Sequence, residues 1–190
     1  MYHSFRNAEI KIFGELKRFE KNGNIIFSHD LTKGLPKEYN QCDLLYSEPS
    51  WLAGYKIFTK RANVLSGSYK EYVEQLSIIT NSEHPVVLIL GKNALKNLNQ
   101  NYSYKKVKLN NHWETAYGWN IDISKYDVKT NYELIHCLSF DFNKVGDMNC
   151  GYGNTGKIFK DNGKHFVMSD ISKKVVYYAA KKIMGYENIS

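Results

Sequence analysis

The chain has 190 residues, 43% of them hydrophobic and 24% charged; this composition is typical of one globular domain and excludes a disordered chain. No apolar run approaches the length of a membrane span, about 18 residues, and no signal peptide is recognisable at the first residues. The formal net charge of +7 favours polyanionic partners such as nucleic acid, although solubility alone also explains part of it.

The cysteines indicate the redox setting. Cys42, Cys137 and Cys150 show neither paired nor metal-ligand spacing, so we expect no disulfide framework and no zinc site. The histidines show no ligand spacing either, and we expect no metal. These features are typical of a reducing, cytoplasmic protein.

The N-terminal half contains short buried strands and one amphipathic helix. Residues 2–20 mix apolar and charged types and are compatible with either a helix or a strand pair. Asn24–Ser28 and Asp43–Ser47 are predicted to be short buried strands. Between residues 68 and 80 the apolar residues recur at helical spacing, and Ser68 stands in the N-cap position.

The C-terminal half alternates strands with helices. His84–Gly91 is the most hydrophobic strand of the chain and needs cover on both faces. The later predicted elements are a short helix at 93–98, an antiparallel edge pair of strands at 105–109 and 115–119, a helix at 131–140, a strand at 145–149 and a helix at 172–184. This alternation predicts an α/β domain with a mostly parallel sheet, helices on both faces and an antiparallel edge hairpin.

A glycine-rich turn follows the strand at 145–149. Residues 147–156 read Asp-Met-Asn-Cys-Gly-Tyr-Gly-Asn-Thr-Gly, and glycines without a Cβ let the backbone turn sharply and approach a ligand closely. A helix opening near Thr155 would point its free N–H groups into that turn. The next predicted strand, 163–170, ends at Asp170, and an acid about 20 residues after a glycine turn suits the hydroxyls of an adenosine ribose.

Residues 147–156 together with 163–172 resemble the S-adenosylmethionine-binding half of DNA amino-methyltransferases. Those enzymes typically carry an Asp-Pro-Phe-x-Gly-Ser-Gly-Thr-Thr-Gly turn and then a strand that ends in Asp-Ile-Ser. The resemblance implies a single Rossmann-like class I methyltransferase domain with S-adenosyl-L-methionine as its cofactor.

A second motif follows the strand at 43–47. Glu48-Pro49-Ser50-Trp51 resembles the Asp-Pro-Pro-aromatic motif of enzymes that methylate exocyclic amino groups. Such an amine is a poor nucleophile because its lone pair is delocalised into the base. A hydrogen-bond acceptor and a backbone carbonyl favour a pyramidal nitrogen, and the aromatic residue stacks on a flipped base. This chain departs from the pattern at Glu48, one methylene longer than Asp, and at Ser50, which replaces a proline that fixes the turn.

The order of the two motifs is similar to that of the circularly permuted class of this family, in which the amine motif comes first. The resemblance divides the domain into an amine and target-base half (24–99), a small recognition hairpin (100–129) and a cofactor half (130–186). The roles that it implies are the target-base site for Glu48, Pro49, Ser50 and Trp51, the adenine edge for Asp30, the ribose hydroxyls for Asp170, and the methionine and ribose path for Asp147, Cys150, Gly151 and Gly153.

Two basic segments are candidates for nucleic-acid contact. The hairpin combines lysines with aromatic residues, which suits phosphate contact and stacking on unpaired bases; we single out Lys105, Lys106 and Trp113. An amphipathic edge hairpin that packs its aromatics on the core explains the same pattern. Lys56, Lys60 and Arg61 follow Trp51 and would lie near the mouth of the site, or are simply solvated.

Three hypotheses follow from the sequence. The first is a methyltransferase acting on adenine N6, or on cytosine N4, in DNA. The second is a catalytically inactive protein of the same fold that binds nucleic acid or a partner subunit, as the departures at Glu48 and Ser50 suggest. The third is an enzyme for RNA or a small amine. The sequence leaves a homodimer open.

Overall fold

The computed structural model describes residues 18–49, 55–57, 59–60, 67–90, 92–109 and 112–185. Within these residues the chain forms an eight-stranded sheet in the order β1-β2-β8-β7-β3-β4-β6-β5. The strands are β1 (Arg18–Lys21), β2 (Asn24–Ser28), β3 (Leu44–Ser47), β4 (Val86–Leu90), β5 (Ser103–Leu109), β6 (His112–Trp119), β7 (Lys144–Asp147) and β8 (His165–Asp170).

The middle of the sheet is parallel and both of its edges are antiparallel. Strands β2, β8, β7, β3 and β4 pair in parallel. At one edge β1 pairs antiparallel with β2, and at the other β6 pairs antiparallel with β4 and with β5. The predicted mostly parallel sheet with an antiparallel edge hairpin is therefore confirmed. The undecided segment 2–20 ends in β1, and its earlier residues lie outside the described part.

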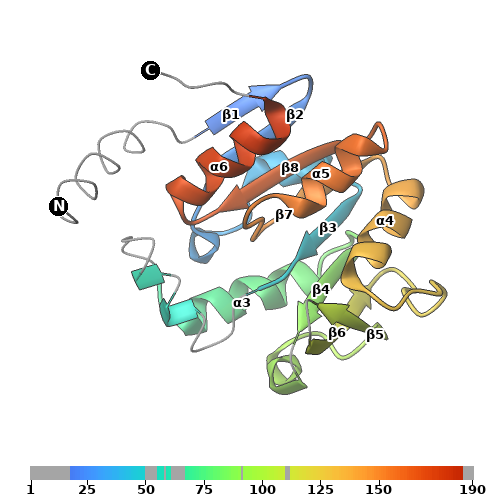
Figure 1. The fold of residues 1–190 in the computed structure, drawn as a ribbon. Coiled ribbons are helices and arrows are strands. Elements are labelled where there is room, and N and C mark those ends of the chain that lie inside the picture. Colours follow the sequence, from blue (N-terminus) through green and yellow to red (C-terminus); the bar gives the residue numbers. More distant parts are fainter. Residues whose placement is uncertain are drawn as a thin grey trace.

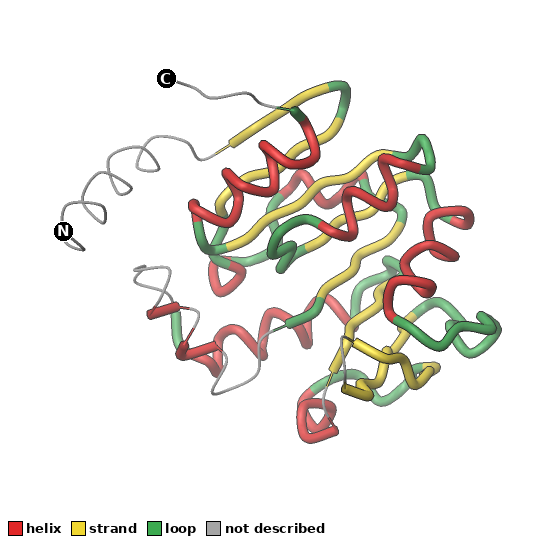
Figure 2. The backbone as a smooth tube through the Cα atoms, in the orientation of Figure 1, coloured by secondary structure: helices red, strands yellow, loops and turns green. Residues whose placement is uncertain are grey.

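Helices cover the two faces of the sheet (Figures 1 and 2). One core cluster joins the sheet to α4 (Asn131–Asp141), α5 (Asn154–Asp161) and α6 (Lys173–Met184). A second cluster on the opposite face joins it to α3 (Tyr69–Thr80), together with the short 3₁₀ helices η1 (Leu31–Lys33) and η2 (Lys37–Gln41). A further 3₁₀ helix, η3 (Lys92–Asn97), follows β4. All five residues of β4 are buried, as expected of a strand that is covered on both faces.

The helix starts follow from local sequence. Ser68 caps α3 as predicted, and Glu71 completes a reciprocal capping box. Thr130 and Glu133 form the same arrangement at the start of α4. Both devices satisfy backbone N–H groups that would otherwise have no partner in the first turn.

Two predicted boundaries differ from the structure. The strand predicted at 145–149 ends at Asp147, because Met148 and Asn149 already form the turn that leads to the glycines. The hairpin strands are longer than predicted, since cross-strand pairing continues from Ser103↔Gly118 to Leu109↔His112. Pairing thus extends these strands beyond their alternating apolar pattern.

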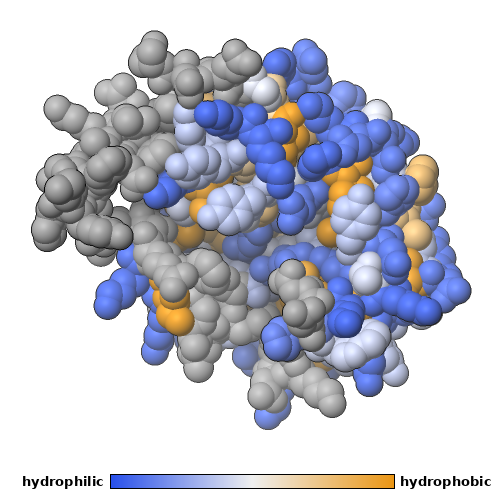
Figure 3. Space-filling model, in the orientation of Figure 1, coloured by the Kyte–Doolittle hydropathy of each residue, from blue (hydrophilic) through white to orange (hydrophobic). Residues whose placement is uncertain are grey.

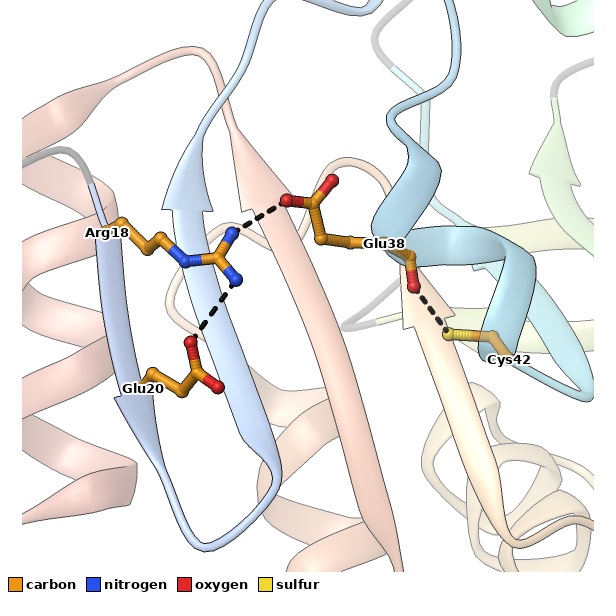
Figure 4. Close-up of polar contacts among 4 residues, drawn as sticks. All are labelled: Arg18, Glu20, Glu38 and Cys42. Atoms are coloured by element: carbon orange, nitrogen blue, oxygen red, sulfur yellow. Dashed lines mark hydrogen bonds and ion pairs between the residues drawn. The ribbon is translucent and has the colours of Figure 1, made fainter.

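A polar contact fastens the β1 edge to the rest of the domain. The Arg18 guanidinium donates to Glu38 Oε1 at 2.7 Å, from β1 to η2, and to Glu20 Oε2 at 3.2 Å (Figure 4). Arg18 also lies over the ring of Phe27, 5.9 Å from its centroid. From β1, this side chain therefore contacts both β2 and η2.

The surface is mostly hydrophilic on the face drawn in Figure 3, where apolar side chains form small separate patches among the coloured atoms. Across the described residues, none of the helices combines the length and the apolar character needed to cross a membrane.

Candidate functional site

A cleft, called here the main cleft, lies at the carboxyl ends of β3, β7 and β8. Successive crossovers run from β7 through α5 to β8 on one side and from β3 through α3 to β4 on the other. The chain connections therefore diverge between β7 and β3, and ligands bind at such a switch point in open α/β sheets. The cleft has a volume of about 290 Å³ and is lined by Tyr46, Glu48, Asp147, Asn149, Cys150, Gly151, Tyr152, Asn154, Thr155, Asp170 and Ile171.

The glycine turn forms one wall of this cleft. Gly151 has φ +49°, and among the described residues no atom lies within 4 Å of the position that a Cβ would take. Gly153 has φ +79°, and a Cβ there would collide with Ile183 of α6. A Cβ on Gly156 would lie 2.5 Å from Met168 Sδ in β8. The first glycine thus leaves room for a ligand, while the other two allow close helix packing.

Asp147 and Asp170 both reach this cleft. Asp147 is 2% exposed, and burial raises its pKa to about 7, with the Thr155 hydrogen bond opposing that shift and the Glu48 charge adding to it. Asp170 accepts from the backbone N–H groups of Gly151 at 3.2 Å and of Ser172 at 2.9 Å. Burial raises the pKa of Asp170 as well, and the two backbone donors oppose that shift.

Glu48 is the third acid of the cleft and is held by two neighbours. The Tyr46 hydroxyl lies 2.8 Å from Glu48 Oε1 and 3.0 Å from Asn131 Oδ1. The Asn131 amide also donates to Glu48 Oε1. Among the described residues, none forms a hydrogen bond with Oε2. One carboxylate oxygen is therefore fixed while the other remains available to a ligand.

The polar partners of the cleft were not all predicted from the sequence. Tyr46 was expected as part of a strand and Asn131 as the first residue of a helix, and neither was predicted to contact Glu48. Asn149 accepts from Ser47 at 2.7 Å and from Tyr72 at 3.0 Å, which joins the glycine turn to β3 and α3. Asn131 directly follows Thr130, a residue type that favours the N-cap position, and this sequence signal places Asn131 at the start of a helix.

Asp30 lies beside the main cleft, in a second cavity of about 40 Å³. Its Oδ1 accepts from the Thr32 backbone N–H at 3.0 Å and from the Thr32 hydroxyl at 2.8 Å. The cavity is also lined by Asn149 and Ile171, which belong to the main cleft as well. The structure thus places Asp30 next to the other predicted cofactor residues, because Asn149 and Ile171 line both cavities.

The remaining residues of the predicted site are placed as follows. Cys150 lines the cleft, its backbone N–H donates to Ser169 at 2.9 Å, and burial raises the pKa of its thiol well above the ordinary value. Pro49 is buried at the end of β3. Ser50, Trp51 and Arg61 lie outside the described residues. Lys56 and Lys60 are exposed, on a segment whose Tyr55 and Thr59 line the smaller cavity.

Both sides of the predicted recognition hairpin contain core residues, and one side also carries exposed side chains. Trp119 and Tyr117 are 1% and 6% exposed and belong to the core, as the packing alternative predicts for these two residues. Trp113 is 64% exposed and Lys106 is exposed. Lys105 is half-buried and points to the opposite side of the strand from Lys106.

Two solved structures have an architecture similar to that of this chain. M1.HpyAVI matches with a TM-score of 0.51 and 15% identity, over 84% of this chain and 98% of that chain. The PvuII DNA methyltransferase, described as cytosine-N4-specific, matches with a TM-score of 0.51 and 10% identity, over 92% and 90%. The fold is similar to that of these two proteins. The predicted single α/β fold is thus confirmed.

A further structure is the M1.HpyAVI-SAM complex, with a TM-score of 0.47 and 14% identity over 84% of this chain and 98% of that chain. No protein-family model matches the sequence, and no curated protein matches it.

The residues of the cleft fit a nucleoside cofactor that carries positive charge. Gly151 leaves open space where another residue would place a Cβ, and three acidic side chains, Glu48, Asp147 and Asp170, line the cavity. The acids of a largely buried site are stabilised in their ionised form by a cation. S-adenosylmethionine carries both a sulfonium and an ammonium group, so its charge complements this lining.

Proposed function

We propose that this chain is an S-adenosylmethionine-dependent methyltransferase that acts on an exocyclic amino group of a nucleic-acid base. The observation that carries the proposal is the convergence of three acids on a glycine-turn cleft at the carboxyl ends of β3, β7 and β8. Adenine N6 of DNA is the first candidate target. Cytosine N4 is the second, because the PvuII enzyme of similar fold is described as cytosine-N4-specific.

The cofactor half would bind S-adenosylmethionine and orient it in the cleft. Asp170 is held by the N–H groups of Gly151 and Ser172, and the remaining lone pairs of its carboxylate would accept from the ribose hydroxyls. Asp147 would face the positively charged methionine end, where a cation stabilises its ionised form. When bound, S-adenosylmethionine supplies a methyl group on a positively charged sulfur, and that chemistry requires alignment with the acceptor.

Glu48 would orient the acceptor amine. Its Oε2 would accept one N–H of the amino group, which favours a pyramidal nitrogen with an exposed lone pair. Tyr46 and Asn131 fix Oε1, so the extra methylene of Glu48 does not leave the carboxylate free to rotate. Precise placement matters because a shift of about 1 Å in a positioning group can reduce a rate roughly a hundredfold.

The alternative is a nucleic-acid-binding protein of the same fold without activity. The departures of the amine motif at Glu48 and Ser50 favour it, because the longer acid and the missing proline both change the turn that would position the amine. The two functions differ in whether a methyl group reaches the nucleic acid.

A transfer assay separates these functions. The protein is incubated with S-adenosylmethionine labelled in its methyl group and with mixed DNA and RNA, and the digested nucleosides are identified by mass spectrometry. We expect labelled N6-methyladenine in DNA from the wild type, and a transfer rate at least tenfold lower in Glu48→Gln. Glu74→Gln is the matched control, because Glu74 lies exposed on α3.

The assay has decisive outcomes. Label in N4-methylcytosine or in RNA would reassign the target. No label in any nucleoside would favour the inactive alternative. Equal rates for Glu48→Gln and the wild type would refute the role of Glu48 in orienting the amine.

A further inference from the structure

One face of the β5–β6 hairpin carries a row of exposed aromatic and basic side chains. Its members are Tyr104, Lys106, Lys108 and Trp113, called here the aromatic–lysine strip. Side chains of alternate strand residues share a face, and directly paired residues do as well. Lys108 pairs with Trp113, Lys106 with Thr115, and Tyr104 with Tyr117. The register therefore places all four members on one face.

The opposite face of the hairpin packs on the core, while on the strip's own face the far end of β6 is buried at Tyr117 and Trp119. On the opposite face, Val107 and Ala116 are fully buried in the cluster that includes α4. Lys105 pairs with Ala116 and belongs to this second face. Tyr104 and Trp113, in contrast, are 61% and 64% exposed. Large aromatic side chains at these exposures contribute little to folding and remain available to a ligand.

The strip extends to the edge of the sheet where the cleft lies. β4 ends at Leu90, which pairs with Thr115, whereas β6 begins three residues earlier at His112. The hairpin therefore projects beyond the end of β4 by about 10 Å at the usual strand rise. Trp113 and Lys108 stand on this projecting part.

A backbone contact links the strip to the proposed amine site. The Lys108 N–H donates to the Lys129 carbonyl at 2.8 Å, and Lys108 also pairs with Thr130. The next residue, Asn131, holds Glu48. The strip and the acid that would meet the amine are thus connected through three consecutive residues.

We propose that the aromatic–lysine strip binds an unpaired stretch of nucleic acid adjoining the target base, so that the preferred substrate of this chain is single-stranded. Exposed rings stack on bases only where the base faces are uncovered, and lysines between the rings neutralise phosphates without reading sequence. In a duplex each base face is covered by its neighbours, and only the lysines could make contact. This inference rests on the proposed function, because it names the substrate class of the same site.

Equilibrium binding to oligonucleotides tests the strip. Fluorescence anisotropy is measured for the full chain with labelled single-stranded DNA, single-stranded RNA and duplex DNA of one sequence, at several salt concentrations. The variants are Trp113→Ala, Lys106→Ala and Lys105→Ala. The two lysine variants are matched, since they remove the same charge from adjacent residues on opposite faces of β5.

We expect tighter binding of the single strands than of the duplex. Trp113→Ala should weaken single-strand binding roughly tenfold, within the range known for base stacking. Lys106→Ala should weaken it and lower the slope of log affinity against log salt by about 0.7, whereas Lys105→Ala should change affinity less than twofold. A preference between the DNA and RNA strands identifies the source of the unpaired bases and leaves the proposal standing.

Equal losses in Lys105→Ala and Lys106→Ala, an unchanged affinity in Trp113→Ala, or a duplex bound as tightly as the single strands would overturn the proposal. Calorimetric binding of S-adenosylmethionine by the same samples separates this failure from failure of the proposed function. A protein that binds the cofactor but fails the anisotropy test refutes the strip alone. A protein that does not bind the cofactor refutes the methyltransferase.

Discussion

Replacing Asp147, a buried acid of the cleft, should stabilise the fold in a pH-dependent way. Burial raises the pKa of Asp147 from 3.8 to about 7, so the folded protein resists ionisation of this carboxyl while the unfolded chain does not. A carboxyl whose pKa is raised by folding does not lower the unfolding free energy at a pH below the pKa that it has in the unfolded chain. It costs stability progressively as the pH rises toward its folded pKa.

The size of the effect follows from the shift. About three pKa units at 1.36 kcal/mol each correspond to about 4 kcal/mol of unfolding free energy above pH 7. The variant Asp147→Asn removes the charge and keeps an oxygen that can accept from the Asn149 N–H, which Asp147 Oδ1 accepts at 3.2 Å. Its advantage over the wild type should grow by about 2 kcal/mol between pH 5 and pH 7 and then level off.

Urea unfolding at pH 5, 6, 7 and 8 measures this difference. Asp161→Asn is the control, because Asp161 lies exposed on α5 and pairs with Lys157. Its effect should stay within about 0.5 kcal/mol at every pH. A stability difference for Asp147→Asn that does not change with pH would refute the assignment of a raised pKa to Asp147.

Three further results follow from the cleft. The affinity for S-adenosylmethionine should fall about tenfold from pH 8 to pH 6 in calorimetric titrations, since protonation of Asp147 near pH 7 removes the charge that faces the cation; an affinity independent of pH would contradict this. Gly153→Ala should lower the unfolding free energy by about 1–3 kcal/mol in urea titrations, because a Cβ there meets α6, whereas Gly151→Ala, which also has a positive φ, should weaken cofactor binding in addition to straining the turn. Tyr46→Phe should lower the methyl-transfer rate several-fold at unchanged cofactor affinity, because Glu48 Oε1 loses a hydrogen bond; a loss of cofactor affinity without a change in rate would exclude this positioning role.

Local patterns were sufficient to predict most elements of the fold. Ser68 and the apolar spacing after it predicted α3, and the glycines at 151, 153 and 156 predicted the turn that forms the cleft wall. These features depend on neighbouring residues, so one segment of sequence contains the whole signal. The short β1 strand was not predicted, since its pairing with β2 and the Arg18–Glu38 contact decide it.

The contacts around Glu48 could not be predicted in the same way. Tyr46 and Asn131 are 85 positions apart in the sequence, and only the sheet order brings α4 beside the end of β3. The hairpin shows a related limit. Alternation places Lys105 and Lys106 on opposite faces, but only the packing of the folded chain makes Lys105 half-buried and Lys106 exposed.

The most direct test of the central claim is calorimetric titration of the protein with S-adenosylmethionine, comparing the wild type with Asp170→Asn and Asp161→Asn. We expect binding by the wild type and by Asp161→Asn. We expect affinity at least tenfold weaker in Asp170→Asn, because hydrogen bonds to a charged group are worth about 1.5–3 kcal/mol. A wild type that does not bind, or an Asp170→Asn variant that binds equally well, would contradict the assignment of the cofactor to this cleft.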